Sequence, residues 1–159
     1  MKFISPTDGA MNIDRVYDTI RRFIYQEPES RYKLIVGTDS HPRSQDVIFV
    51  SAIVIYRVGR GGRFFYHKEN DGLNVSMKQR IFYEVSRSLD VASKLTAVFA
   101  EDRELTETLD IEIHVDVGEK GPTNEIIREV IGMVVGNGYE ALIKPESYAA
   151  SSVADRYTK

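Results

Sequence analysis

The sequence predicts a single α/β domain built on a five-stranded mixed sheet flanked by helices. The chain has 159 residues, which suits one ordinary domain with a real core. Three strand-like runs follow one another in its first half, which favours antiparallel pairing, and later strands alternate with helices, which favours parallel crossovers. We therefore expect residues 1–159 to form one domain, with residues 1–30 as an N-terminal helical extension.

The first half of the chain predicts one helix and a meander of three strands. Asn12 is expected to cap a helix whose apolar residues recur at helical spacing up to Ile24, before Pro28 ends it. A glycine-rich turn at residues 59–62 separates the last two strands, which are rich in β-branched and aromatic residues. The three strands are expected at residues 33–38, 47–58 and 63–67.

The second half alternates helices and strands. Asn74 is expected to cap a long helix with an apolar stripe from Met77 to Ala92, and the acid-rich residues 101–107 to form a solvated connection. Ser151 or Ser152 is expected to cap the closing helix. The remaining elements are expected at residues 110–117 (strand), 121–136 (helix), 140–144 (strand) and 151–157 (helix).

Composition excludes several classes of protein. The net charge of −3, from 21 basic and 24 acidic residues, argues against binding of nucleic acid by bulk electrostatics, but it allows an enzyme with an acidic site. The chain has no cysteine, so thiolate metal sites are excluded. No apolar run reaches the roughly 18 residues of a membrane span, and the first residues lack the apolar core of a secretory signal. We expect a cytoplasmic protein without a membrane partner.

Two aspartates follow strand-like runs. Asp39 comes directly after the first predicted strand, where open α/β sheets form their sites, although a local turn toward His41 would also explain it. Asp116 lies near the end of the strand at residues 110–117 and points away from its apolar face. An exposed strand face would explain Asp116 equally well. The two carboxylates can meet only if their strands are neighbours.

Two further acids lie in predicted helices. Glu84 falls about 80–90° from the centre of the apolar stripe, on the shoulder of the buried face, where most glutamates reach out to solvent. Asp155 is expected in the first turn of the closing helix, where a favourable interaction with the helix dipole would account for it.

The order of these four acids along the chain supports a shared function more strongly than any one of them does alone. Four carboxylates on successive elements could hold two Mg²⁺ or Mn²⁺ ions about 3.5–4 Å apart, one ion activating water and the other stabilising a leaving oxygen. Hard cations of this kind prefer oxygen ligands. The pattern predicts metal-dependent hydrolysis, with Asp39, Glu84, Asp116 and Asp155 as catalytic and metal-binding residues.

This order resembles the ribonuclease H-like fold, and four stretches resemble the YkuK family of predicted ribonuclease H-like nucleases. The resemblance implies that fold, places Asp39, Asp116 and Asp155 at the acidic positions of the superfamily, and carries over Glu84 less directly. It implies a nucleic-acid substrate near Ser40 and His41, although we expect glutamine in the family at position 41. The stretches are residues 3–9 (FISPTDG), 37–40 (GTDS), 114–118 (HVDVG) and 144–156 (KPESYAASSVADR).

Three functions follow as hypotheses. The leading one is a Mg²⁺- or Mn²⁺-dependent nuclease acting on RNA, DNA or their hybrid, and the alternative is a catalytically inactive nucleic-acid-binding module of the same fold. A third is a transition-metal hydrolase using His41 and His114 beside the aspartates. Basic side chains that could contact phosphates, or merely form a solvated face, are Arg60, Arg63, Arg80, Arg87 and Lys94.

Overall fold

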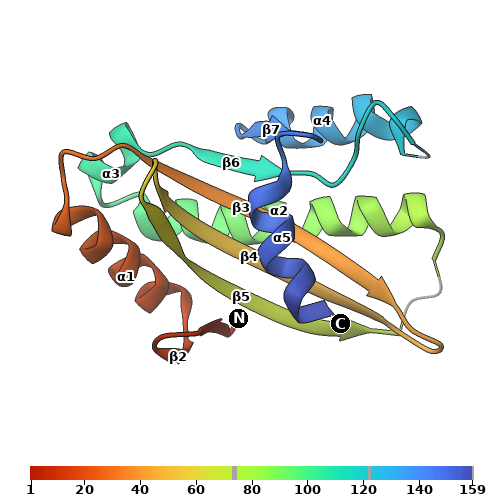
Figure 1. Ribbon diagram of the computed structural model, residues 1–159, viewed down its shortest axis with the longest axis horizontal. Coiled ribbons are helices and arrows are strands. Elements are labelled where there is room, and N and C mark those ends of the chain that lie inside the picture. The colour runs from red at the N-terminus through yellow and green to blue at the C-terminus, as the bar shows by residue number, and fades with distance from the viewer. Residues whose placement is uncertain (73–74, 122, 159) are drawn as a thin grey trace.

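A seven-stranded sheet with helices on both faces forms the domain, in a computed structural model that describes residues 1–72, 75–121 and 123–158 (Figure 1). The strand order is β2-β1-β5-β4-β3-β6-β7. The predicted mixed α/β sheet is confirmed, but the predicted number of five strands was wrong. Two strands of three residues each, in a region predicted to be a helical extension, form a hairpin that extends the sheet beside β5.

The elements follow the predicted order with three additions, which are β1, β2 and a short helix α3. In chain order they are β1 (Phe3–Ser5), β2 (Gly9–Met11), α1 (Ile13–Gln26), β3 (Tyr32–Pro42), β4 (Val47–Arg57), β5 (Gly61–Asp71), α2 (Met77–Phe99), α3 (Arg103–Thr108), β6 (Ile111–His114), the 3₁₀ turn η1 (Asn124–Ile126), α4 (Ile127–Gly136), β7 (Glu140–Leu142) and α5 (Tyr148–Thr158).

The strands β3 and β5 are longer than predicted, and this changes the position of Asp39. The strand β3 pairs with β4 along its whole length, from Tyr32 opposite Arg57 to Pro42 opposite Val47. Asp39 therefore lies inside β3 and not after it. Gly37 is the last residue of β3 that pairs with β6. Beyond it, among the described residues, β3 pairs only with β4. Proline is tolerated in such an edge segment.

Three helix boundaries also differ from the prediction. The predicted cap Asn74 lies outside the described residues, and Ser76 caps α2. The predicted solvated connection contains α3, because the side chain of Asp102 accepts a hydrogen bond from the backbone of Leu105 and caps a short helix. The closing helix begins at Tyr148, so Ser151 and Ser152 lie within it and do not cap it.

The capping box of α2 gives a first testable prediction. The hydroxyl of Ser76 accepts a hydrogen bond from the backbone N–H of Gln79, whose side chain accepts one from the backbone of Ser76. We expect Ser76→Ala to lower the free energy of unfolding in urea by about 1 kcal/mol. Ser86→Ala, at an exposed position within α2, is the control and should be neutral or slightly stabilising. Equal effects of the two substitutions would contradict the capping role.

The two faces of the sheet are covered by different helices. Apolar residues of α1 and α2 pack against β3, β4 and β5 on one face, and α2 and α4 pack against β6 on the same face. The helix α5 crosses the opposite face, where Ala154 packs against Ile48, Val50 and Ala52 of β4 (Figure 1). The sheet is therefore held between a helical layer and the single helix α5. Among the described helices, none combines the length and the apolar character of a membrane span.

Candidate carboxylate site

Asp39 and Asp116 lie at the same end of two neighbouring strands. The strands β3 and β6 run parallel, and Gly37 pairs with His114 at the end of β6. Asp39 lies two residues beyond this pair in β3, and Asp116 lies two residues beyond it after the end of β6. The condition for the two carboxylates to meet, that their strands are neighbours, is therefore fulfilled. The strand β6 ends at His114 and not at residue 117 as predicted; just beyond it, the backbone N–H of Val117 donates to the carbonyl of Val115, two residues earlier.

Alternation along β3 sends its side chains to opposite faces. The hydroxyl of Thr38 forms hydrogen bonds with Ser51 of β4 at 2.9 Å and with Ser88 of α2 at 2.8 Å. Asp39, one residue later, faces α5 instead, where the hydroxyl of Thr158 lies 3.4 Å from its carboxylate. The buried hydroxyl network of Thr38 thus holds β3 against α2 directly beside Asp39.

Glu84 is buried, contrary to the usual behaviour of a glutamate on the shoulder of a helix. It lies one turn before Ser88 in α2, and only 8% of its surface is exposed. Ser40, which faces the same side of the sheet as Thr38, donates a hydrogen bond to its carboxylate at 2.5 Å. Ser40, predicted as a substrate-binding residue, thus holds Glu84 beside the end of β3.

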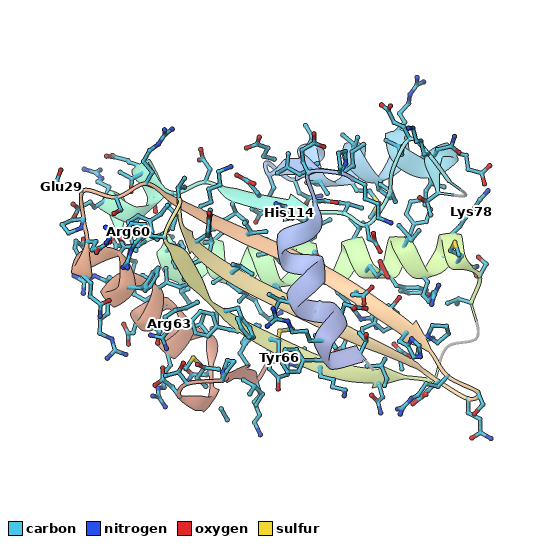
Figure 2. The ribbon with its side chains drawn as sticks, viewed as in Figure 1. Glu29, Arg60, Arg63, Tyr66, Lys78 and His114 are labelled. Atoms are coloured by element: carbon cyan, nitrogen blue, oxygen red, sulfur yellow. The ribbon has the colours of Figure 1, made fainter. Side chains whose placement is uncertain are left out.

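Asp155 approaches the site from the second half of α5, not from the first turn as predicted. Two contacts fix how α5 lies on the sheet. Ala154 is fully buried against β4, and the ring of Tyr157 stacks on Tyr66 of β5 with centroids 3.8 Å apart. Tyr66 lies beside α5 in Figure 2. With α5 fixed in this way, the negative charge of Asp155 acts on Asp39.

Electrostatic interactions relate Asp39 to each of the other three acids. Burial, followed by the negative charges of Asp116 and Asp155, raises the pKa of Asp39 to about 6. The pKa of Glu84 is raised to about 8, chiefly by burial; the hydrogen bond from Ser40 opposes this rise, and the negative charges of Asp39 and Asp116 add to it. Each of these two acids therefore favours a proton, or another positive charge, at this position.

A positive charge in the site comes from Lys144, which is not among the residues predicted from the sequence. Its ammonium nitrogen lies 2.8 Å from a carboxylate oxygen of Asp116. Lys144 follows β7, the parallel neighbour of β6, and its backbone N–H donates to the carbonyl of Val117 at 2.8 Å. The signal that could have found it is its place at the start of residues 144–156, the longest stretch resembling the YkuK family.

The donor set fits hard divalent cations. Its members are carboxylates, and their mutual repulsion is the kind that Mg²⁺ or Mn²⁺ relieves. Within the described residues, however, no three acidic or imidazole side chains already surround one point as metal ligands. Asp116 instead forms an ion pair with Lys144, and Glu84 accepts a hydrogen bond from Ser40. The acids are gathered but each has a partner from its own chain.

Of the two candidate histidines, His114 has a partner outside the acid cluster. His114 is buried, and its Nε2 lies 3.3 Å from Glu112 in the same strand, while burial lowers the pKa of the imidazole. His41 is exposed near the end of β3, on the same face as Asp39. This arrangement gives no support to the transition-metal hypothesis, in which both histidines would act beside the aspartates.

Most of the predicted basic rim is engaged within the chain. Arg87 forms ion pairs with Glu69 and Asp71 and lies over the ring of Phe49. The other pairs are Lys94 with Asp90, Arg63 with Asp8 and Arg60 with Glu27. Arg80 is half-buried, and its charge lowers the pKa of Glu84. Arg80 is therefore the member of this set whose charge acts on the candidate site.

Comparisons with known proteins agree with this arrangement. A family model described as ribonuclease H-like matches residues 15–159. The chain is also 30% identical, over 171 residues, to the YkuK protein of Bacillus subtilis (strain 168), and the match covers 99% of this chain and 96% of that protein. The mixed sheet with flanking helices is the one that the resemblance implied. The chain therefore belongs to the YkuK family of ribonuclease H-like proteins.

Proposed function

We propose that this protein is a metal-dependent nuclease that hydrolyses phosphodiester bonds of RNA, DNA or an RNA/DNA hybrid. The observation that carries the proposal is the convergence of acids from four separate elements on the end of β3. The negative charges of Asp116 and Asp155 raise the pKa of Asp39, and those of Asp39 and Asp116 raise the pKa of Glu84. Structural carboxylates are usually paired with cations, whereas gathered, repelling carboxylates are typical of sites that bind metal ions or move protons. Membership of a ribonuclease H-like family supports the nuclease reading.

The four acids would hold two Mg²⁺ or Mn²⁺ ions. When bound, such ions supply a hydroxide nucleophile and stabilise the leaving oxygen. Asp39 is held on a strand paired along its length, so its carboxylate is positioned before any ligand arrives. Ser40 orients Glu84, and Thr158 donates to Asp39 from α5. His41, exposed on the same strand face, would contact the substrate beside the acids.

The alternative is a module that binds nucleic acid without cutting it. The ion pair of Asp116 with Lys144 motivates it, because an internal cation could replace the metal permanently. The two functions differ in metal uptake. A nuclease of this kind takes up divalent ions in calorimetric titration with Mn²⁺, whereas a binding module with a permanent internal cation does not.

The test is cleavage of labelled single-stranded, duplex and hybrid oligonucleotides with Mg²⁺, Mn²⁺ or EDTA. We expect cleavage of at least one substrate with either metal and none in EDTA. Cleavage that persists in EDTA would contradict the proposed metal dependence. Failure to cut any of the substrates, together with binding of one of them, would replace the nuclease by the binding module.

A further inference from the structure

The ion pair between Lys144 and Asp116 is built into the ends of two parallel strands. In the pairing of β6 with β7, His114 lies opposite Leu142. Asp116 lies two residues after His114, and Lys144 lies two residues after Leu142. The backbone hydrogen bond from Lys144 to Val117 fixes the start of the lysine side chain beside Asp116. Gly118 leaves room for this approach, because a Cβ there would lie 3.2 Å from the Cβ of Lys144. The backbone therefore positions the side chain of Lys144 beside the carboxylate of Asp116.

Stability alone does not account for the pair. The side chain of Lys144 is 59% exposed, and exposed ion pairs contribute little to the stability of a fold. Its electrostatic surroundings are unusual, because the carboxylate it contacts also acts on Asp39 and Glu84. Lys144 thus brings a positive charge to a carboxylate whose own charge acts on Asp39 and Glu84.

We propose that Lys144 is a phosphate-binding residue of the site, which holds Asp116 in the metal-free protein and transfers its ammonium to the scissile phosphate when a divalent cation binds Asp116. This inference rests on the proposed nuclease function. A lysine ammonium on a flexible four-carbon stem is a strong point-charge ligand for phosphate. Because Lys144 is exposed, its ammonium can leave Asp116 without the backbone moving. At the scissile phosphate, the ammonium would stabilise the negative charge that grows on the phosphate in the transition state.

Substitution of Lys144 should move metal binding and cleavage in opposite directions. In Lys144→Gln the competitor for Asp116 is gone, so we expect calorimetric titration without substrate to show Mn²⁺ binding about three- to tenfold tighter. Cleavage at saturating Mn²⁺ should fall about 10²-fold. Lys144→Arg keeps the charge and should retain more of the cleavage than the glutamine variant. A merely structural lysine would not produce tighter metal binding together with slower cleavage.

The matched control is Lys78→Gln. Lys78 is similarly exposed and forms an ion pair with Glu125 at 2.6 Å, but it lies at the N-terminal end of α2, away from α5 (Figure 2). We expect this variant to bind Mn²⁺ and cleave as the wild type does. Unchanged Mn²⁺ affinity and cleavage in Lys144→Gln would overturn the proposal and leave Lys144 as an ordinary surface partner of Asp116.

The result remains interpretable if the nuclease function itself fails. If the wild-type protein cuts no oligonucleotide, fluorescence anisotropy can measure the affinity of the uncut oligonucleotide in the presence of Mn²⁺. Weaker binding by Lys144→Gln, together with tighter Mn²⁺ binding, would support the phosphate contact in a binding module. Equal oligonucleotide affinities of the wild type and the variant would overturn it.

Discussion

Replacing Asp39 by asparagine should reduce metal-dependent cleavage by at least about 10³-fold while leaving the protein folded. Asp39 interacts with each of the other three acids, because the charges of Asp116 and Asp155 raise its pKa and its own charge raises the pKa of Glu84. The neutral amide removes a negative charge from the site and replaces the proposed metal ligand by a weaker one. It keeps the size of the side chain and an oxygen that can accept the hydrogen bond from Thr158.

The stability of this variant separates a catalytic role from a structural one. Repulsion and burial disfavour the charge on Asp39, so the asparagine variant should unfold at a temperature equal to or above that of the wild type. Asp90→Asn is the control, because Asp90 is exposed on α2 and paired with Lys94 outside the site. We expect the control to cleave normally. Cleavage by Asp39→Asn within about tenfold of the wild type would remove Asp39 from the proposed machinery.

The long-range arrangement of the site could be predicted because strand order follows from the pattern of elements. Three consecutive strands and two later crossovers leave β3 central, with β6 as its parallel neighbour, and this places Asp39 and Asp116 together. The prediction that Asp39 follows its strand failed for a local reason. The polar residues 39–42 read as a loop, but the apolar start of β4 pairs with them and extends the sheet.

The missed features depend on contacts that no local pattern encodes. The strands β1 and β2 have three residues each, too few to display a period of two, and β1 is held by pairing with β5 far along the chain. Glu84 is buried beside Ser40, a residue 44 positions away that donates a hydrogen bond to it from the sheet. Lys144 reaches Asp116 only because β7 lies parallel to β6. Each of these features arises from tertiary pairing, not from the composition of its own segment.

Replacing Glu84 by glutamine should stabilise the fold progressively as the pH rises. The pKa of Glu84 rises from 4.5 to about 8 in the folded protein, so the folded state binds this proton more tightly than the unfolded state. The resulting stability is fully present below about pH 4.5 and is lost as the pH increases through about 8. Glutamine carries no proton to lose, and its side-chain oxygen can still accept the hydrogen bond from Ser40.

Urea unfolding of the two proteins between about pH 5 and pH 9 measures this difference. At ~1.4 kcal/mol per pKa unit the shift corresponds to at most about 5 kcal/mol, and we expect roughly 2–4 kcal/mol in favour of the variant near pH 9. Near pH 5 the two free energies of unfolding should almost coincide. Glu129→Gln, at an exposed position of α4, serves as the control and should show no such divergence.

Divalent cations connect this stability effect to the proposed function. A cation that binds the ionised acids of the folded state adds stability in proportion to its occupancy, about 2.7 kcal/mol at 100 times its dissociation constant. Mg²⁺ or Mn²⁺ should therefore restore the stability that the wild type loses near pH 9 and should do so less in Glu84→Gln, which has one fewer anionic ligand. Equal stabilisation of both proteins by the metal would place the binding site away from Glu84. A stability difference that responds to pH but not to metal would favour a buried structural acid at this position.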